Sequence, residues 1–288
     1  MDILLTGLIL GGTYALIAVG LNLQYGMARI MNLANGEVLV AGGFAAFWFL
    51  TGAGLSPLLT VFVVAPLAFA LNWLIYVAML RPLVRRAKSR GQLEVDSILA
   101  TFGLSFVAVG LMLWLFGGDY FSYSYLASPV RLMGSTYGMN RIAAFLAAAA
   151  ICGALWLWLN RSRPGLAIRA IATAPDSARL VGIDVPRLAA LAFALGGAVT
   201  AAGGALISMF LTLDASTGVL FTLKALIIVI MGGVGDIRGT VVAALLLGVL
   251  ETFVAVVIDP GLTLAAAYLL FLFVLLVRPQ GLFGRRQA

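Results

Sequence analysis

Long apolar runs make up most of the chain, and short clusters of glycine, proline and charged residues interrupt them. A run of about 20 apolar residues is what an α-helix needs to cross a hydrocarbon core about 30 Å thick. The runs lie at 3–25, 30–50, 57–80, 96–116, 141–159, 187–211, 220–235, 239–258 and 262–277. The seventh run is short and broken by glycine, so eight continuous helices with one broken element is an equally good count.

Composition supports this pattern. Hydrophobic residues make up 63% of the 288 residues and charged residues only 10%, with a mean hydropathy of +1.11. Soluble domains are closer to half apolar and a quarter charged, so the solvent of this chain is lipid. We therefore predict an all-α, polytopic integral membrane protein that forms one domain, 1–288. The first run lacks a basic start and a cleavage site of small residues, so we expect a retained span and not a signal peptide.

The positions of the basic residues predict the orientation. If the C-terminus is cytoplasmic, fifteen of the 18 lysines and arginines fall in inside loops, and only Arg131, Arg141 and Lys224 fall outside. Cytoplasmic loops of membrane proteins carry such an excess, so we expect an odd number of crossings with the N-terminus outside. The net charge of +7 is then a consequence of topology, and it does not indicate a nucleic-acid partner.

Several chemistries are disfavoured by what the sequence lacks. It has no histidine, which removes histidine-based metal sites and catalytic triads, and its one cysteine, Cys152, lies in an apolar run. The glycine-rich segment 231–239 is not followed by the GK[ST] of a phosphate loop, so it predicts a tight turn between half-helices. We expect no enzyme activity, no metal and no bound cofactor. Uphill transport would need an ion gradient or a separate ATPase.

Polar residues at the start of the second run need an explanation. Glu37 lies where a helix should be in hydrocarbon, and a carboxylate there costs about 2.5 to 3.5 kcal/mol unless it finds a partner or water. Asn32 and Asn35 offer amide groups one turn apart, and Gly36 permits close backbone approach. Two interpretations stay open, a packed polar cluster or part of a solute path or gate.

Glu251 is the other clear titratable group inside a span. An ion-coupled carrier or channel using Glu37 and Glu251 is therefore a rival to an ATP-driven transporter. Gly232 and Gly233 lie in the broken element before Glu251, and we include them among the candidate path or gate residues. The run of small residues at 195–205 favours close helix packing.

The longest polar loop, 160–187, predicts a short cytoplasmic helix. Pro175 suits a first helical position, Asp176 and Arg179 are three residues apart, and Gly182 can end the helix in a left-handed conformation. Apolar side chains accompany the basic ones, and they would lie either on lipid or on another protein. These are Leu166, Ile168, Ile171, Leu180, Val181 and Ile183.

At these positions the sequence resembles the LivH-type permeases of branched-chain amino acid ABC importers, over nearly the whole chain. The resemblance is carried by the segments NLANGE at 32–37, GLAIRA at 165–170, ARLVGID at 178–184, GGVG at 232–235 with Gly239 and Glu251, and RPQGLFG at 278–284. It implies a fold like that of type II ABC importer permeases, with loop 160–187 as the coupling helix that seats in an ATPase. The candidate coupling residues are Gly165, Arg169, Ala170, Asp176, Arg179, Gly182, Ile183 and Asp184.

The resemblance also implies partners and a cargo. The partners are a second, LivM-like permease subunit, two cytoplasmic ATPase subunits that bind the ATP, and a periplasmic solute-binding protein, all at a bacterial inner membrane. The sequence departs from the usual pattern at Asn35, where a histidine is common, at Ala174, where Asp or Asn is common, and at 215–218. The cargo is a branched-chain or related neutral amino acid, and relatives of this type also serve urea, short amides and other small solutes.

Overall fold

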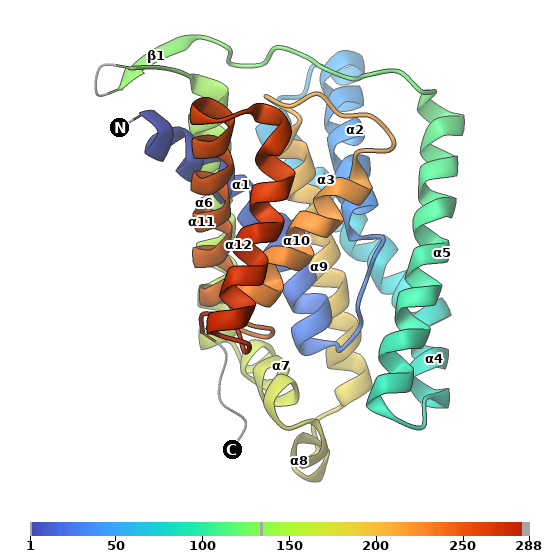
Figure 1. The fold of residues 1–288 in the computed structure, drawn as a ribbon. Helices are drawn as coiled ribbons and strands as arrows, with labels where there is room; N and C mark the ends of the chain where they lie inside the picture. The colour runs from blue at the N-terminus through green and yellow to red at the C-terminus, as the bar shows by residue number, and fades with distance from the viewer. Residues whose placement is uncertain (1, 133–134, 284–288) are drawn as a thin grey trace.

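The computed structural model describes residues 2–132 and 135–283, which form a helical bundle (Figure 1). The helices of the first half are α1 (Asp2–Asn22), which continues as a π-helical turn (Leu23–Met27), α2 (Asn35–Ala53), α3 (Pro57–Ile75), a second π-turn (Tyr76–Leu80), α4 (Arg81–Arg86) and α5 (Arg90–Phe116). Those of the second half are α6 (Met139–Arg161), α7 (Arg163–Thr173), α8 (Pro175–Leu180), α9 (Val185–Ile207), α10 (Gly218–Gly232), α11 (Ile237–Val257), a 3-10 turn (Pro260–Leu262) and α12 (Thr263–Val277).

The prediction of an all-α membrane protein is confirmed, and the helix count is closest to the version with eight continuous helices and one shorter element. Within the described residues, eight helices are long and apolar enough to cross a membrane, and α10 is a shorter apolar helix of 15 residues. Figure 1 shows α1 beginning at the upper end of the bundle and α12 ending at the lower end. The described chain therefore begins and ends at opposite ends of the bundle, as an odd number of crossings requires. A small hairpin, β1 (Pro129–Leu132) with β2 (Ser135–Gly138), lies at the upper end.

Helix α9 is the centre of the bundle, because 89% of the residues in its most apolar 18-residue stretch are buried. Its small residues lie where other backbones come close: the peptide oxygens of Gly20, Ala201 and Leu39 lie at its contacts with α1 and α2. Lipid tails are as apolar as side chains, so helices in a membrane associate through such close packing and not through a hydrophobic driving force. The predicted packing role of 195–205 is confirmed.

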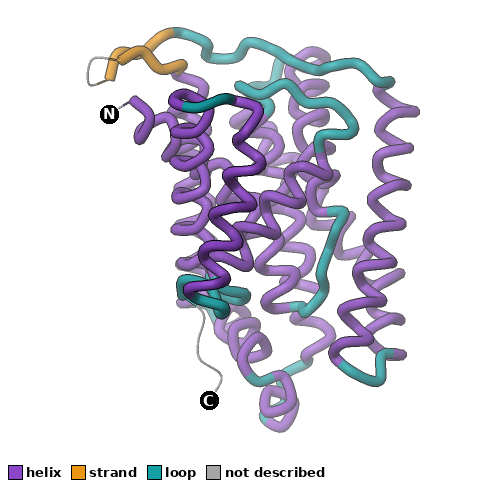
Figure 2. Tube along the Cα trace, viewed as in Figure 1, coloured by secondary structure: helices purple, strands orange, loops and turns teal. Residues whose placement is uncertain are grey.

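The second span does not begin at residue 30 as predicted. Residues 28–34 are not helical, and they return through the bundle between the end of α1 and the start of α2 (Figure 2). The Oδ1 atom of Asn32 accepts a hydrogen bond of 3.0 Å from the backbone N–H of Ala34. Such side-chain bonds to nearby backbone compete with the helix and favour its interruption here.

The polar loop forms two short helices, α7 and α8, at the lower end of the bundle (Figure 1). Its apolar side chains do not form one surface, which corrects the prediction of a single stripe on lipid or on another protein. Ile168 and Ile171 are buried in the bundle's own core, whereas Leu180 and Val181 are 89% and 75% exposed. Two of the six side chains are therefore ordinary core, whereas Leu166 of α7, which is 50% exposed, and the tip at α8 are free to meet something else.

Candidate functional site

The asparagines predicted to lie in a packed cluster or a solute path are both buried and hydrogen bonded. Asn35 donates to the carbonyl oxygen of Ile17 at 3.3 Å and accepts from the Thr200 hydroxyl at 3.1 Å. Asn32 donates to the Oε1 atom of Gln24 at 2.9 Å. These bonds tie the start of α2 to α1 and α9, because a buried amide without partners would be costly.

The next two residues connect α2 to α10 and α5. The backbone N–H of Gly36 donates to the Thr222 hydroxyl at 2.8 Å, and a Cβ at position 36 would lie only 1.8 Å from the carbonyl oxygen of Gly218. Glu37 is 1% exposed and its Oε1 accepts from the Ser105 hydroxyl at 2.8 Å. Its Oε2 atom is buried and has no hydrogen-bond partner among the described residues. One carboxylate oxygen of Glu37 therefore has the interior hydrogen-bond donor that its position demands, and the other oxygen can accept from a further donor.

Helix α5 faces this cluster with small polar residues. Ser97, Thr101 and Ser105 recur every four residues, and all three side chains are buried. The Thr101 hydroxyl accepts from the backbone N–H of Leu33 at 3.1 Å and lies 3.1 Å from the carbonyl oxygen of Met31. The hydroxyls of α5 are thus matched to the non-helical segment, while another face of the helix carries exposed apolar side chains such as Phe102 and Phe106.

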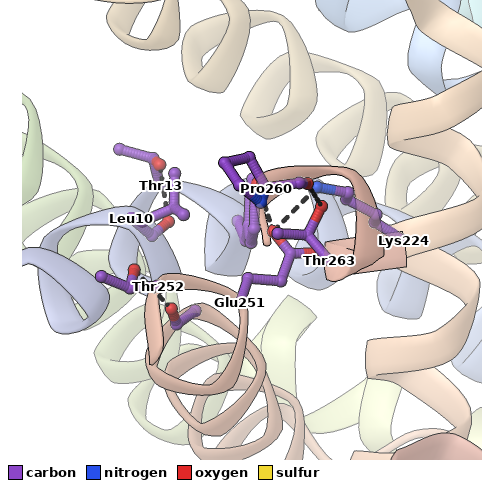
Figure 3. Close-up of polar contacts among 9 residues, drawn as sticks. Leu10, Thr13, Lys224, Glu251, Thr252, Pro260 and Thr263 are labelled. Carbon is purple, nitrogen blue, oxygen red and sulfur yellow. Dashed lines mark hydrogen bonds and ion pairs between the residues drawn. The ribbon is translucent and has the colours of Figure 1, made fainter. Parts of the chain in front are cut away.

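Glu251 lies in a second polar group, together with Lys224 and Tyr14. The Lys224 ammonium lies 2.8 Å from the Glu251 Oε2 atom, and Figure 3 shows the two side chains facing each other. The Tyr14 hydroxyl donates to the same carboxylate oxygen at 2.9 Å and accepts from Lys224 at 2.9 Å. The assignment of Lys224 to the outer side is therefore wrong: it lies on α10 and is ion-paired inside the bundle.

The predicted tight turn lies between α10 and α11 at the lower end. The N–H groups of Leu282 and Phe283 donate to the last carbonyls of α10, at Met231 and Gly232, over 2.7 and 3.2 Å. A Cβ at Gly232 would lie 2.5 Å from the backbone nitrogen of Thr240, and Gly233 has φ +103°. Gly232 and Gly233 thus lie in close backbone packing. They lie at the end of α10 that is opposite to Gly218 and Thr222, the residues that contact α2 beside Glu37. Their role in a path or gate stays a prediction.

The candidate coupling residues are spread over α7, α8 and the turn that follows. Arg169 donates to the side-chain oxygen of Asn160, and Gly165 packs against the last turn of α6. Ala170 lies in α7, and Ile183 is half-buried with its N–H bonded to the carbonyl oxygen of Ala178 at 3.1 Å.

The end of the candidate coupling element follows the predicted signals. Gly182 adopts φ +79°, the left-handed conformation expected of it, and Asp184 caps α9 by accepting from the N–H of Arg187 at 3.2 Å. Asp176 and Arg179 belong to α8, as predicted, but their side chains lie outside what the structure describes.

Metal binding finds no support in the part of the chain that the structure describes. No group of three or more carboxylates, thiols or imidazoles comes together there. Cys152 is buried in the core on α6, consistent with a structural thiol.

Comparison with known proteins decides the family. Residues 3–277 match the family model described as the permease component of branched-chain amino acid transport systems. The chain belongs to this family. It is 31% identical over 296 residues to the high-affinity branched-chain amino acid transport system permease protein BraD of Pseudomonas aeruginosa, covering 98% of this chain and 95% of that protein. It is 29% identical over 308 residues to LivH of Escherichia coli, covering 97% and 94%.

A solved structure is similar in fold. PsaBC from Streptococcus pneumoniae, in complex with a Fab, aligns with a TM-score of 0.50 and 14% identity over 98% of this permease and 94% of that chain. The likeness extends over nearly the full length of both chains. It supports the predicted transporter-permease fold and carries no information about cargo.

Sequence reasoning missed the partners of the two carboxylates. Ser105 is 68 residues from Glu37, and Lys224 is 27 residues from Glu251. A lysine six residues into an apolar helix was the available signal, because such a residue needs a partner as much as a glutamate does. No comparable signal marks Ser105, Thr101 or Thr222, since hydroxyl residues are common in membrane helices.

Proposed function

We propose that this chain is the permease subunit of an ATP-binding cassette importer that moves branched-chain or related neutral amino acids across a bacterial inner membrane. The observation that carries the proposal is the family match over 3–277, together with relatives whose names give this transport system. Energy comes from separate ATPase subunits, and the permease itself holds no cofactor. A LivM-like second permease subunit and a periplasmic binding protein complete the assembly.

The C-terminus is cytoplasmic and the N-terminus periplasmic in this proposal. The lower end of the bundle carries Arg81, Arg85 and Arg86 on α4 and Arg163 and Arg169 on α7. At the upper end, Asp2 opens α1 and Asp259 precedes the turn before α12. The positive-inside rule therefore supports a cytoplasmic lower end.

The cytoplasmic element α7–α8 receives the ATPase. Leu180 and Val181 are large, apolar and exposed beside basic residues, as a docking tip requires. Ile168 and Ile171 anchor the same element in the permease core. A helix pair that is anchored at one side and exposed at the other can pass movement from the ATPase to the membrane helices.

Translocation then follows alternating access. Closure of the ATPases on ATP moves α7 and α8, the two permease subunits rock against each other, and a passage opens to one side and then to the other. The buried polar residues Asn32, Asn35, Gly36 and Glu37, with Gly232, Gly233 and Glu251, are the proposed path or gate. Glu251 is already paired with Lys224, so this carboxylate is less available to bind a coupling ion.

The test is reconstitution. The permease, its LivM-like partner and the two ATPases are placed in vesicles with enclosed ATP, and the binding protein is added outside. We expect leucine uptake that requires ATP and the binding protein, and no uptake by this permease alone. Uptake by the single chain, driven by a proton or sodium gradient and indifferent to ATP, would overturn the proposal. Binding of leucine, urea and acetamide to the partner binding protein identifies the cargo, and preference for urea or acetamide would replace the amino acid in the proposal.

A further inference from the structure

The non-helical segment 28–34 touches the coupling element directly. The Nη2 atom of Arg29 donates a hydrogen bond of 3.3 Å to the carbonyl oxygen of Ala172. Ala172 lies in the last turn of α7. Backbone carbonyl oxygens in that turn have no N–H donor within the helix, and the helix dipole favours a cation beside them. A guanidinium is therefore well suited to hold the end of α7.

Arg29 also has an unusual backbone. Its φ is +57°, a left-handed conformation that residues with a Cβ adopt at a cost of about 1 to 2 kcal/mol. Such conformations persist where surrounding contacts hold them, and they are concentrated at functional sites. Glycine or asparagine would relieve the strain but would lack the guanidinium that reaches α7. The position therefore combines a strained backbone with a side chain that bonds another element.

Room exists beside this contact. Arg29 borders a cavity of about 380 Å³ that is also lined by Lys88 and Ser89 of the α4–α5 connection, by Ile171 of α7 and by Pro186 of α9. A side chain enclosed on all sides would fix α7 in one place. A side chain at the edge of a cavity can follow α7 when it moves.

The other end of the segment is bonded to the helices around the polar cluster. Thr101 of α5 bonds the backbone of Leu33 and Met31, as described above, and the Thr222 hydroxyl of α10 lies 3.2 Å from the carbonyl oxygen of Leu33. Gln24 accepts from Asn32 and donates to the carbonyl oxygen of Phe193 on α9 at 3.2 Å. A displacement of the segment thus reaches α5, α9 and α10 through hydrogen bonds a few residues from Arg29.

We propose that Arg29 is a positioning residue that transmits movement of α7 to segment 28–34, and through it to α5 and α10 beside Glu37. The inference rests on the proposed function, because it needs an ATPase that moves α7. It adds a named mechanical link between the coupling element and the polar cluster. Arg29 contacts neither the cargo nor ATP in this proposal.

The readout that separates transmission from simple support is the number of ATP molecules hydrolysed per solute imported. A residue that only stabilises the fold lowers the amount of complex, and both activities fall together. A transmitting residue leaves the complex assembled and the ATPases active while uptake falls. Loss of a charge-assisted hydrogen bond predicts a fall in uptake of about tenfold or more.

The experiment compares Arg29→Ala, Arg29→Lys and Arg29→Gly with Arg85→Ala in the reconstituted complex. Arg85 is an exposed arginine at the same end, on α4, and serves as the matched control. We expect Arg29→Ala and Arg29→Gly to raise the ATP-to-solute ratio about tenfold, Arg29→Lys to restore it in part because it keeps a cation, and Arg85→Ala to match the wild type. Because Arg29→Gly relieves the backbone strain, it stays informative if Arg29→Ala fails to fold.

Two results would overturn the inference. One is an unchanged ratio in Arg29→Ala and Arg29→Gly, and the other is a loss of uptake and ATP hydrolysis in equal proportion in all Arg29 variants. Failure of the proposed function is a different outcome, since the wild-type complex would then show no ATP-dependent uptake. If the wild-type complex couples uptake to ATP hydrolysis and the Arg29 variants have the same ATP-to-solute ratio, this inference alone is rejected.

Discussion

The ion pair between Lys224 and Glu251 offers a direct test of how charge is accommodated inside this bundle. The perturbation is Lys224→Met, which keeps the length and apolar stem of the side chain and removes its charge. It leaves Glu251, 3% exposed, without its cation, and with Tyr14 as its remaining donor among the described residues. A second variant, Lys224→Met with Glu251→Gln, removes both charges and keeps an amide oxygen to accept from Tyr14.

The magnitude follows from the geometry of the pair. The two charged atoms are 2.8 Å apart, and the side chains are 18% and 4% exposed. Removing one partner of such a buried pair costs about 3 to 5 kcal/mol, whereas replacing both by neutral groups of similar size is often nearly neutral. Since Lys224 retains some exposure, we expect the lower value, about 3 kcal/mol, for the single variant. For a chain of this size that corresponds to a fall in Tm of about 5 °C.

The assay is thermal unfolding of the detergent-purified protein, followed by circular dichroism. Lys88→Met is the control, because Lys88 is the other lysine of the chain and is exposed. We expect Lys224→Met to lose about 5 °C, the double variant to recover at least half of that loss, and the control to be unchanged. The reasoning fails if Lys224→Met is as stable as the wild type, or if the double variant is less stable than the single one.

Three further substitutions test other contacts. Gly36→Ala places a Cβ 1.8 Å from a carbonyl oxygen of α10 and should lower the free energy of unfolding by about 1 to 3 kcal/mol. Gly52→Ala is the control and should be harmless, because a Cβ there meets nothing within 4 Å, and equal melting temperatures of the two variants would contradict the contact. Gly182→Val forces a β-branched residue to φ +79° and should raise the number of ATP molecules hydrolysed per solute imported. Gly182→Asn should not, because asparagine tolerates the left-handed conformation, and a normal ratio for both variants would argue against a coupling role. Ser105→Ala removes the donor to Glu37 and should cost about 1 to 3 kcal/mol of unfolding free energy, and Ser105→Thr should restore it; full stability of the alanine variant would show that the bond is dispensable.

Much of the candidate site was predicted from single residues that do not belong in lipid. Glu37 and Glu251 were recognised because a carboxylate in an apolar run must have a partner, and both are buried and bonded. The same reasoning was not applied to Lys224, because the charge rule counts lysines by the side of the membrane and ignores their depth. The structure shows that its charge is satisfied inside the bundle and does not report on topology.

The loop and the second span show a different limit. Ile168 and Leu180 are equally apolar in the sequence, yet one is buried in the core and the other is 89% exposed. Nothing in the loop's own pattern could separate them, because the difference depends on whether α6 and the rest of the core lie underneath. The exit from helical structure at 28–34 likewise depends on acceptors and donors from α5 and α10.

The sequence by itself determined that the chain is suited to lipid, roughly where most of its apolar helices lie, and which loops are basic. These follow from length, apolarity and charge, which are properties of each segment alone. Only the tertiary structure decided which face of each helix is interior, which residue partners each buried charge, and that Arg29 reaches α7. Lipid and protein interior are equally apolar, so hydrophobic periodicity does not distinguish them, and hydrogen-bond partners dozens of residues apart are specified only when the helices pack.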